Sequence, residues 1–265
     1  MRLFIMTDLE GASGVSGPKE ELDPRTGRKF AEACANLTHD VNAEVEGAIE
    51  AGAEDVVVLD GAGRRFTILR NLLHPRAGLL QGARAGELTG LDESFEAMFV
   101  IGAHAMAGTP DGVLNHTFSS RLIHNVWLNG RQCGEVEILA AWTGQLGIPL
   151  VLVSGDRAAT EEVRPILPDT ELVAVKDGMS QDYARLRPAG EVAAMLRAAA
   201  KRAVEKRSRV APYRVPHPVE IQIEFLETQT ADRMARRPGA KRVDGRTVKA
   251  KGETIADALA LLLPW

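Results

Sequence analysis

The sequence predicts an α/β fold with a mainly parallel sheet flanked by helices, and three observations support this prediction. Short apolar runs alternate with longer segments of helical period, a pattern typical of parallel sheets covered by helices. The apolar runs DVVVLDG, AMFVIGAH and PLVLVSGD end in glycines and ionisable residues, and LFIM is followed by Thr7 and then Asp8. The chain of 265 residues also has the size of a single α/β unit, which often reaches roughly 250 residues.

The first strand is expected at Leu3–Met6, followed by an amphipathic helix from Arg28 to Ala51 that ends at Gly52. DVVVLDG, AMFVIGAH and PLVLVSGD are predicted to be three further buried strands. Between the last two, IHNVWLNGRQCGE indicates a hairpin, because Asn-Gly is a preferred two-residue turn between twisted strands. A helix over Glu135–Gly147 should follow the hairpin.

The last part of the chain differs in character. An Ala- and Arg-rich helix is expected over Ala189–Arg207, after which VAPYRVPHP supplies three prolines where a connection should lie. VEIQIEFLE then alternates apolar and polar residues, as a half-solvated strand does. We therefore predict an α/β core over residues 1–209 and a smaller C-terminal α+β section over 210–265, either within the same domain or as a small unit of its own.

Composition narrows the function classes. The formal net charge of −4, with acidic and basic residues interspersed, gives no broad positive field for nucleic acid. The two cysteines, Cys34 and Cys133, cannot form a disulfide framework or a four-thiolate zinc site, which fits a reducing compartment. No apolar stretch approaches the length of a membrane span. The sequence thus predicts a cytoplasmic protein without nucleic-acid or membrane partners.

Ionisable residues gather where the predicted strands end. Asp8 and Glu10, Asp60, His104 and Asp156 each lie at or just beyond the carboxyl end of an apolar run. Ligands of open α/β sheets bind at this edge. Carboxylates and imidazoles from several strands suit zinc, manganese or a similar divalent ion. The convergence predicts a metal site.

Each member of this set also has a structural interpretation. Asp8 can cap the following loop, Asp60 before a glycine is as typical of a turn as of a ligand, and Asp156 fits a helix cap. Two carboxylates as close as those of Asp8 and Glu10 favour a cation between them, because they otherwise repel. An isolated His104 would more often be a satisfied core residue.

Two further segments carry candidate groups. The turn-rich loop GTPDGVLNHTF contains His116, which in a metal hydrolase can donate to the leaving group but can equally be a surface histidine. Glu135 and Glu137 lie at the start of the helix after the hairpin, where the helix dipole alone accounts for acidic residues.

Taken together, these motifs resemble the DppA-type D-aminopeptidases. MTDLEGASGV, the strand ending in LDG, IGAHAMAGTPDGVLNHT, the LNGRQCGE hairpin, and VLVSGD followed by VAVKDG occur in the order found in that family, over about the first 190 residues. The resemblance implies an α/β fold with a dinuclear zinc site, in stacked pentameric rings that enclose the active sites.

Carried over residue by residue, the resemblance implies that Asp8 bridges two zinc ions and that Glu10 and His104 complete one site. Glu135 would bind the other ion, and His116 matches the family's catalytic histidine.

One position departs from the family pattern. The family has D-S-H or D-G-H after the second strand, and that histidine is a ligand of the second zinc, whereas this chain has Ala62. The first site is therefore intact and the second is depleted. Asp60 or Glu137 could supply the missing ligand; Glu137 would face the same side as Glu135 only if the hairpin strand continued through it.

These observations favour a metal-dependent hydrolase with one or two zinc ions per chain that removes N-terminal residues from short D-amino-acid peptides or amides. Its partners would be the small substrate and other copies of the chain, in pentameric rings or a decamer. The alternatives are an amide or ester hydrolase that is not a peptidase, and a non-catalytic relative that binds a small molecule or a metal.

Overall fold

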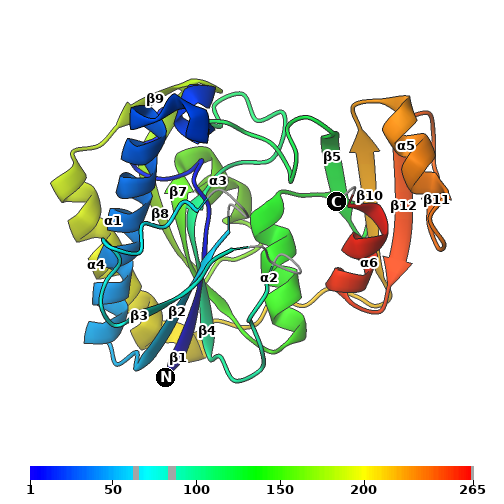
Figure 1. Ribbon diagram of the computed structural model, residues 1–265. Coiled ribbons are helices and arrows are strands. Elements are labelled where there is room, and N and C mark those ends of the chain that lie inside the picture. Colours follow the sequence, from blue (N-terminus) through cyan, green and yellow to red (C-terminus); the bar gives the residue numbers. More distant parts are fainter. Residues whose placement is uncertain (62–65, 83–87, 264–265) are drawn as a thin grey trace.

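The computed structural model describes residues 1–61, 66–82 and 88–263 and contains two sheets (Figure 1). The larger has the strand order β3-β2-β1-β4-β7-β8-β9, and all neighbours in it are parallel except β8 and β9. Its strands are β1 (Arg2–Thr7), β2 (Asp55–Asp60), β3 (Ala77–Leu80), β4 (Ala97–Ala103), β7 (Leu150–Asp156), β8 (Glu171–Ser180) and β9 (Tyr183–Leu186).

Helices cover both faces of this sheet, and the alternation of side chains along β1 shows how. Leu3 and Ile5 pack in one apolar cluster with residues of α1 (Arg28–Glu50) and α4 (Ala189–Lys206). Phe4 and Met6 point to the other face, into a cluster with α2 (Glu135–Gln145) and α3 (Arg157–Val163). Because a strand has a period of two, a run that is apolar at every position becomes buried on both sides.

The smaller sheet is antiparallel, with the order β11-β12-β10-β5-β6. It lies beside α2 on the right of Figure 1. Its strands are β5 (Ile123–Leu128), β6 (Arg131–Gln132), β10 (Val219–Phe225), β11 (Lys241–Arg242) and β12 (Thr247–Gly252), and it is covered by α5 (Thr228–Ala235) and α6 (Ile255–Leu262). Alternate residues of β10 are buried, as its polar-apolar alternation predicted. Short 3₁₀ turns occupy Lys19–Leu22, Pro24–Thr26 and Arg207–Arg209.

The structure confirms the predicted α/β class and the predicted strands and long helices. Asn129 and Gly130 join β5 to β6 with positive φ angles of 49° and 86°, as the Asn-Gly signal indicated. The helix predicted to end at Gly147 ends at Gln145. The strands β3, β8, β9, β11 and β12 were not predicted.

The position of the β5–β6 hairpin bears on the predicted boundary between the core of residues 1–209 and the C-terminal section of residues 210–265. β5 and β6 precede that residue, yet β5 pairs with β10 in the smaller sheet. The C-terminal section therefore shares its sheet with a hairpin from the first part of the chain, and a domain boundary at 209/210 stays a prediction. Among the described helices, none has the length and apolar character that a membrane span requires.

Candidate metal centre

The parallel pairing of β1 and β4 brings Asp8 next to His104. Both residues directly follow their strands, and the Asp8 amide donates to the carbonyl oxygen of Ile101 at 2.8 Å. His104 Nε2 lies 3.2 Å from Asp8 Oδ2. The expectation that groups at the carboxyl ends of neighbouring strands converge is confirmed for this pair.

Two glycines allow this close approach of backbone segments. The Gly11 amide donates to the Gly102 carbonyl oxygen at 2.8 Å, and a Cβ on Gly11 would lie 2.0 Å from the Ala103 carbonyl oxygen. Gly102 has φ +78°, and a Cβ there would lie 1.9 Å from the Asp8 carbonyl oxygen. The glycines of the D-x-E-G and G-A-H motifs thus place Asp8, Glu10 and His104 together.

Glu135 reaches the same point from the start of α2. Its Oε1 lies 3.4 Å from His104 Nε2 and accepts a hydrogen bond from the Phe118 amide at 2.7 Å. The helix dipole therefore does not fully explain Glu135, because its carboxylate points towards the His104 imidazole.

His116 lies over His104 because the loop after β4 folds back on itself. The His116 amide donates to the Ala105 carbonyl oxygen at 3.3 Å, and the two imidazole rings stack with centroids 4.0 Å apart and an interplanar angle of 13°. His116 Nε2 is 4.0 Å from Glu135 Oε1. The surface-histidine alternative does not fit, since only 15% of the side chain is exposed.

Backbone carbonyls set the orientation of both imidazoles. Nδ1 of His104 donates to the Ala105 carbonyl oxygen at 3.0 Å, and Nδ1 of His116 donates to that of Leu114 at 2.8 Å. A carbonyl oxygen can only accept, so each Nδ1 carries the hydrogen and each Nε2 faces the carboxylates. This arrangement is the usual way in which metal-binding histidines are oriented.

The charges of the clustered residues favour the binding of a cation. Burial disfavours ionisation of Asp8 and Glu135, but His104, together with the Glu10 hydrogen bond to Asp8 and with His116 and the Phe118 amide at Glu135, lowers the pKa of both carboxyls. The pKa of His104 rises well above its usual value, because the attraction of Asp8 and Glu135 exceeds the opposing effect of burial. Burial, together with repulsion from Asp8, raises the pKa of Glu10.

These donors fit a divalent metal. Glu135 and the two imidazoles can each offer one ligand atom within 4.8 Å of the others, and Asp8, after the neighbouring strand β1, contacts His104. A set of carboxylate oxygens and imidazole Nε2 atoms is the donor chemistry of zinc sites in hydrolases. Asp8, Glu10, His104, Glu135 and His116 therefore form one cluster.

Two other candidates, Asp60 and Asp156, form hydrogen bonds within the scaffold. The Asp60 carboxylate accepts from Thr67 Oγ1, the Ile68 amide and Gln81 Nε2 at 2.6, 3.1 and 2.9 Å, so its carboxylate is occupied. Asp156 caps α3, as one interpretation predicted, through the Ala158 amide.

The carboxylate of Glu137 is engaged with Arg131 and Tyr213. The structure begins α2 at Glu135, so the alternative in which the strand continues is wrong, and residues two apart on a helix point in different directions. The Glu137 carboxylate forms an ion pair with Arg131 and accepts from Tyr213 Oη at 3.2 Å. Ala62 itself lies outside the described residues.

Two groups near the cluster were not singled out from the sequence. Glu162 on α3 accepts from the Met106 amide at 2.8 Å, and burial raises its pKa to about 6. The buried ammonium of Lys176 on β8 contacts the loop that carries Glu10. The motif VAVKDG contains this lysine, but an isolated lysine in a strand gives no signal of burial.

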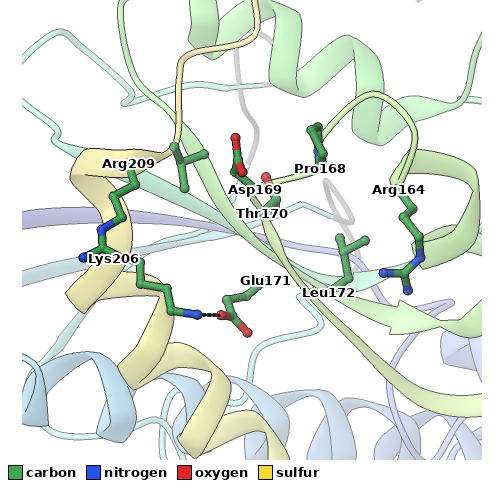
Figure 2. Close-up of a pocket in the computed structure, with 9 residues that line it drawn as sticks. Arg164, Pro168, Asp169, Thr170, Glu171, Leu172, Lys206 and Arg209 are labelled. Carbon is green, nitrogen blue, oxygen red and sulfur yellow. Dashed lines mark hydrogen bonds and ion pairs between the residues drawn. The ribbon is translucent and has the colours of Figure 1, made fainter.

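A separate pocket of about 470 Å³ lies at the opposite edge of the sheet, around the start of β8 and the end of α4 (Figure 2). Two of the charged residues that line it form an ion pair, with Lys206 Nζ 3.0 Å from Glu171 Oε1. It contains none of the clustered residues, so it is not the metal centre.

Comparisons with known proteins agree with this geometry. The family model described as D-aminopeptidase, Peptidase_M55, matches residues 1–263. A D-aminopeptidase of Bacillus subtilis (strain 168) is 26% identical over 99% of this chain and 96% of its own length. The solved structure of the Zn-dependent D-aminopeptidase DppA from Bacillus subtilis, described as a self-compartmentalizing protease, superposes with a TM-score of 0.93, at 25% identity over 98% of this chain and 95% of that one. The chain therefore belongs to the Peptidase_M55 family of D-aminopeptidases.

Proposed function

We propose that this chain is a zinc-dependent aminopeptidase that removes N-terminal residues from short D-amino-acid peptides or amides. The observation that carries the proposal is the convergence of Asp8, Glu135 and two oriented imidazoles, in a chain whose family is that of the D-aminopeptidases.

Asp8, Glu10 and His104 would hold one zinc ion, and Glu135 would share a second with Asp8. A bound ion would supply Lewis acidity for the scissile carbonyl and for water. Asp60 and Glu137 are engaged elsewhere, and Ala62 offers no donor atom. We therefore expect one firmly bound ion per chain.

His116 would carry the proton transfer. Because its Nδ1 hydrogen is held by the Leu114 carbonyl, Nε2 is the nitrogen that can take up a proton and pass it to the departing amine. Burial and repulsion from His104 lower the pKa of His116, so at neutral pH the ring is mainly the proton acceptor. The loop that stacks it on His104 holds Nε2 at the cluster.

The deciding experiment is elemental analysis of protein purified without chelator, together with hydrolysis of a D-alanyl peptide, its L-counterpart and a simple ester before and after chelation. One zinc per chain with chelator-sensitive cleavage of the D-peptide supports the proposal, and two ions would mean that another donor has replaced the lost histidine. Ester cleavage alone favours a non-peptidase hydrolase. No metal and no activity favour the binding protein.

Two variants test the individual roles. Asp8→Ala should lose both zinc and activity. His116→Ala should keep its zinc and lose roughly 10²-fold or more in kcat, the usual contribution of general acid-base catalysis. Full activity of His116→Ala would remove the histidine from the mechanism.

We also propose that the protein forms homo-oligomers, as pentameric rings that stack into a decamer. The family membership and the self-compartmentalizing relative support this proposal. Sedimentation equilibrium measures the assembly, and a monomer at micromolar concentration would contradict it. A cytoplasmic location remains a prediction from the cysteine content; Cys34 and Cys133 are free and buried.

A further inference from the structure

Lys176 is a fully buried lysine whose ammonium group is enclosed by a single loop. It lies on β8, and its Nζ donates to the backbone carbonyl oxygens of Glu10, Ala12 and Val15 at 2.6, 3.0 and 2.8 Å. An ammonium has three hydrogens. All three are therefore used by the loop that follows β1 and carries Asp8 and Glu10.

The loop needs such a donor. It crosses from the end of β1 over β4 towards β8, without a regular element that could satisfy its carbonyls, and buried carbonyl oxygens require partners. A second tether comes from α1, where Asp40 accepts from the Ser13 amide and hydroxyl, both at 2.8 Å. The third tether is the hydrogen bond from the Gly11 amide to the Gly102 carbonyl oxygen.

Burial of this charge is costly, so its retention calls for a reason. Lysines are almost never fully buried without compensation. Burial lowers the pKa of Lys176 to about 8, and the carboxylates of Asp156, Asp40, Glu21 and Glu10, from several elements around the ammonium, oppose this only in part. An apolar side chain would fill the same space without that cost, but it would remove the donor of the Glu10 and Val15 carbonyl oxygens and leave that of Ala12 with only the Val15 amide.

We propose that Lys176 is a positioning residue, which holds the 8–15 loop in the conformation that lets Asp8 and Glu10 bind metal. The inference rests on the proposed function, since it assumes that these carboxylates are ligands. Lys176 itself does not touch the reacting groups. It acts through the backbone of Glu10, the residue whose carbonyl oxygen is nearest to its Nζ.

The test compares Lys176→Met, which keeps the length of the side chain, with Lys176→Arg and with Lys249→Met, a control on β12 in the smaller sheet. Zinc affinity is measured by competition with a coloured chelator, and kcat and KM on a D-alanyl peptide at saturating zinc. Amide hydrogen exchange of residues 11–15 is measured on the zinc-free proteins.

Lys176→Met should bind zinc at least tenfold more weakly, lose kcat more than it raises KM, and exchange the loop amides at least tenfold faster. Lys176→Arg should recover part of all three, and Lys249→Met should match the wild type. If Lys176→Met does not fold, Lys176→Gln, which retains two donor hydrogens, takes its place.

A folded variant with wild-type zinc affinity and kcat would overturn the proposal, even if its stability were lower, because Lys176 would then support only the fold. A wild-type protein that binds no zinc would instead refute the proposed function. In that case the amide exchange rates of the zinc-free proteins alone show whether Lys176 holds the 8–15 loop in place.

Discussion

Glu44 should make the stability of this protein fall as the pH rises above about 4.5. It is fully buried on α1, where Ser154 Oγ of β7 donates to its Oε1 at 2.6 Å, while Oε2 has no hydrogen-bond partner within the described chain. Burial raises the pKa of Glu44 well above 4.5, and the neighbouring Asp40 raises it further. The folded protein therefore holds this proton after the unfolded chain has lost it.

The sign and size follow from proton linkage. Where the folded state binds the additional proton, the free energy of unfolding decreases with pH, by at most about 1.4 kcal/mol per unit for one group. Between pH 5 and 7 Glu44 thus removes at most about 2.7 kcal/mol. The Glu44→Gln variant cannot titrate, so its stability relative to the wild type should rise over this range by up to that amount.

Urea unfolding of the zinc-free proteins at pH 5, 6 and 7 measures the difference. The new amide hydrogens of the glutamine lack a partner at every pH, so this cost cancels in the comparison. Glu46→Gln on the exposed side of the same helix is the matched control and should show no such trend. A constant difference between Glu44→Gln and the wild type at all three pH values would refute the reasoning.

Two further substitutions test the close approach of strands and the role of Glu137. Gly102→Ala introduces a Cβ 1.9 Å from the Asp8 carbonyl oxygen at φ +78°. We therefore expect a loss of about 2 kcal/mol or more in unfolding free energy and weaker zinc binding in a chelator titration. Unchanged zinc binding would contradict the predicted displacement of Asp8. Glu137→Gln should leave the zinc content unchanged in elemental analysis and cost about 1.5–3 kcal/mol through the lost ion pair with Arg131; loss of an ion would identify Glu137 as a ligand.

The sequence predicted those parts of the site that follow from local rules. An apolar run ending in an ionisable residue identifies a strand and the edge of the sheet that its end reaches. That rule was enough to bring Asp8 and His104 together, because β1 and β4 are neighbours. It failed to separate them from Asp60 and Asp156, which end strands of the same sheet but form hydrogen bonds within the scaffold.

What the sequence could not predict depends on partners that are distant along the chain. Tyr213, which engages Glu137, is 76 residues away, and Lys176 is 166 residues from Glu10. No periodicity encodes such contacts. For Glu135, the helix dipole is enough to explain an acidic residue at the start of a helix. Only the resemblance to a family assigned Glu135 a role as a metal ligand.

The smaller sheet explains how Glu135 is held at the metal centre. β5 pairs with β10, so the hairpin is fixed to the C-terminal section, and the Cys133 amide donates to the Val126 carbonyl oxygen at 3.0 Å just before α2 begins. The path of the chain into α2 is thus set by strand pairing rather than by the parallel sheet that supplies Asp8 and His104. A loss of pairing between β5 and β10 would release the hairpin that leads into Glu135. The C-terminal section therefore belongs to the function of the site, although none of the clustered residues comes from it.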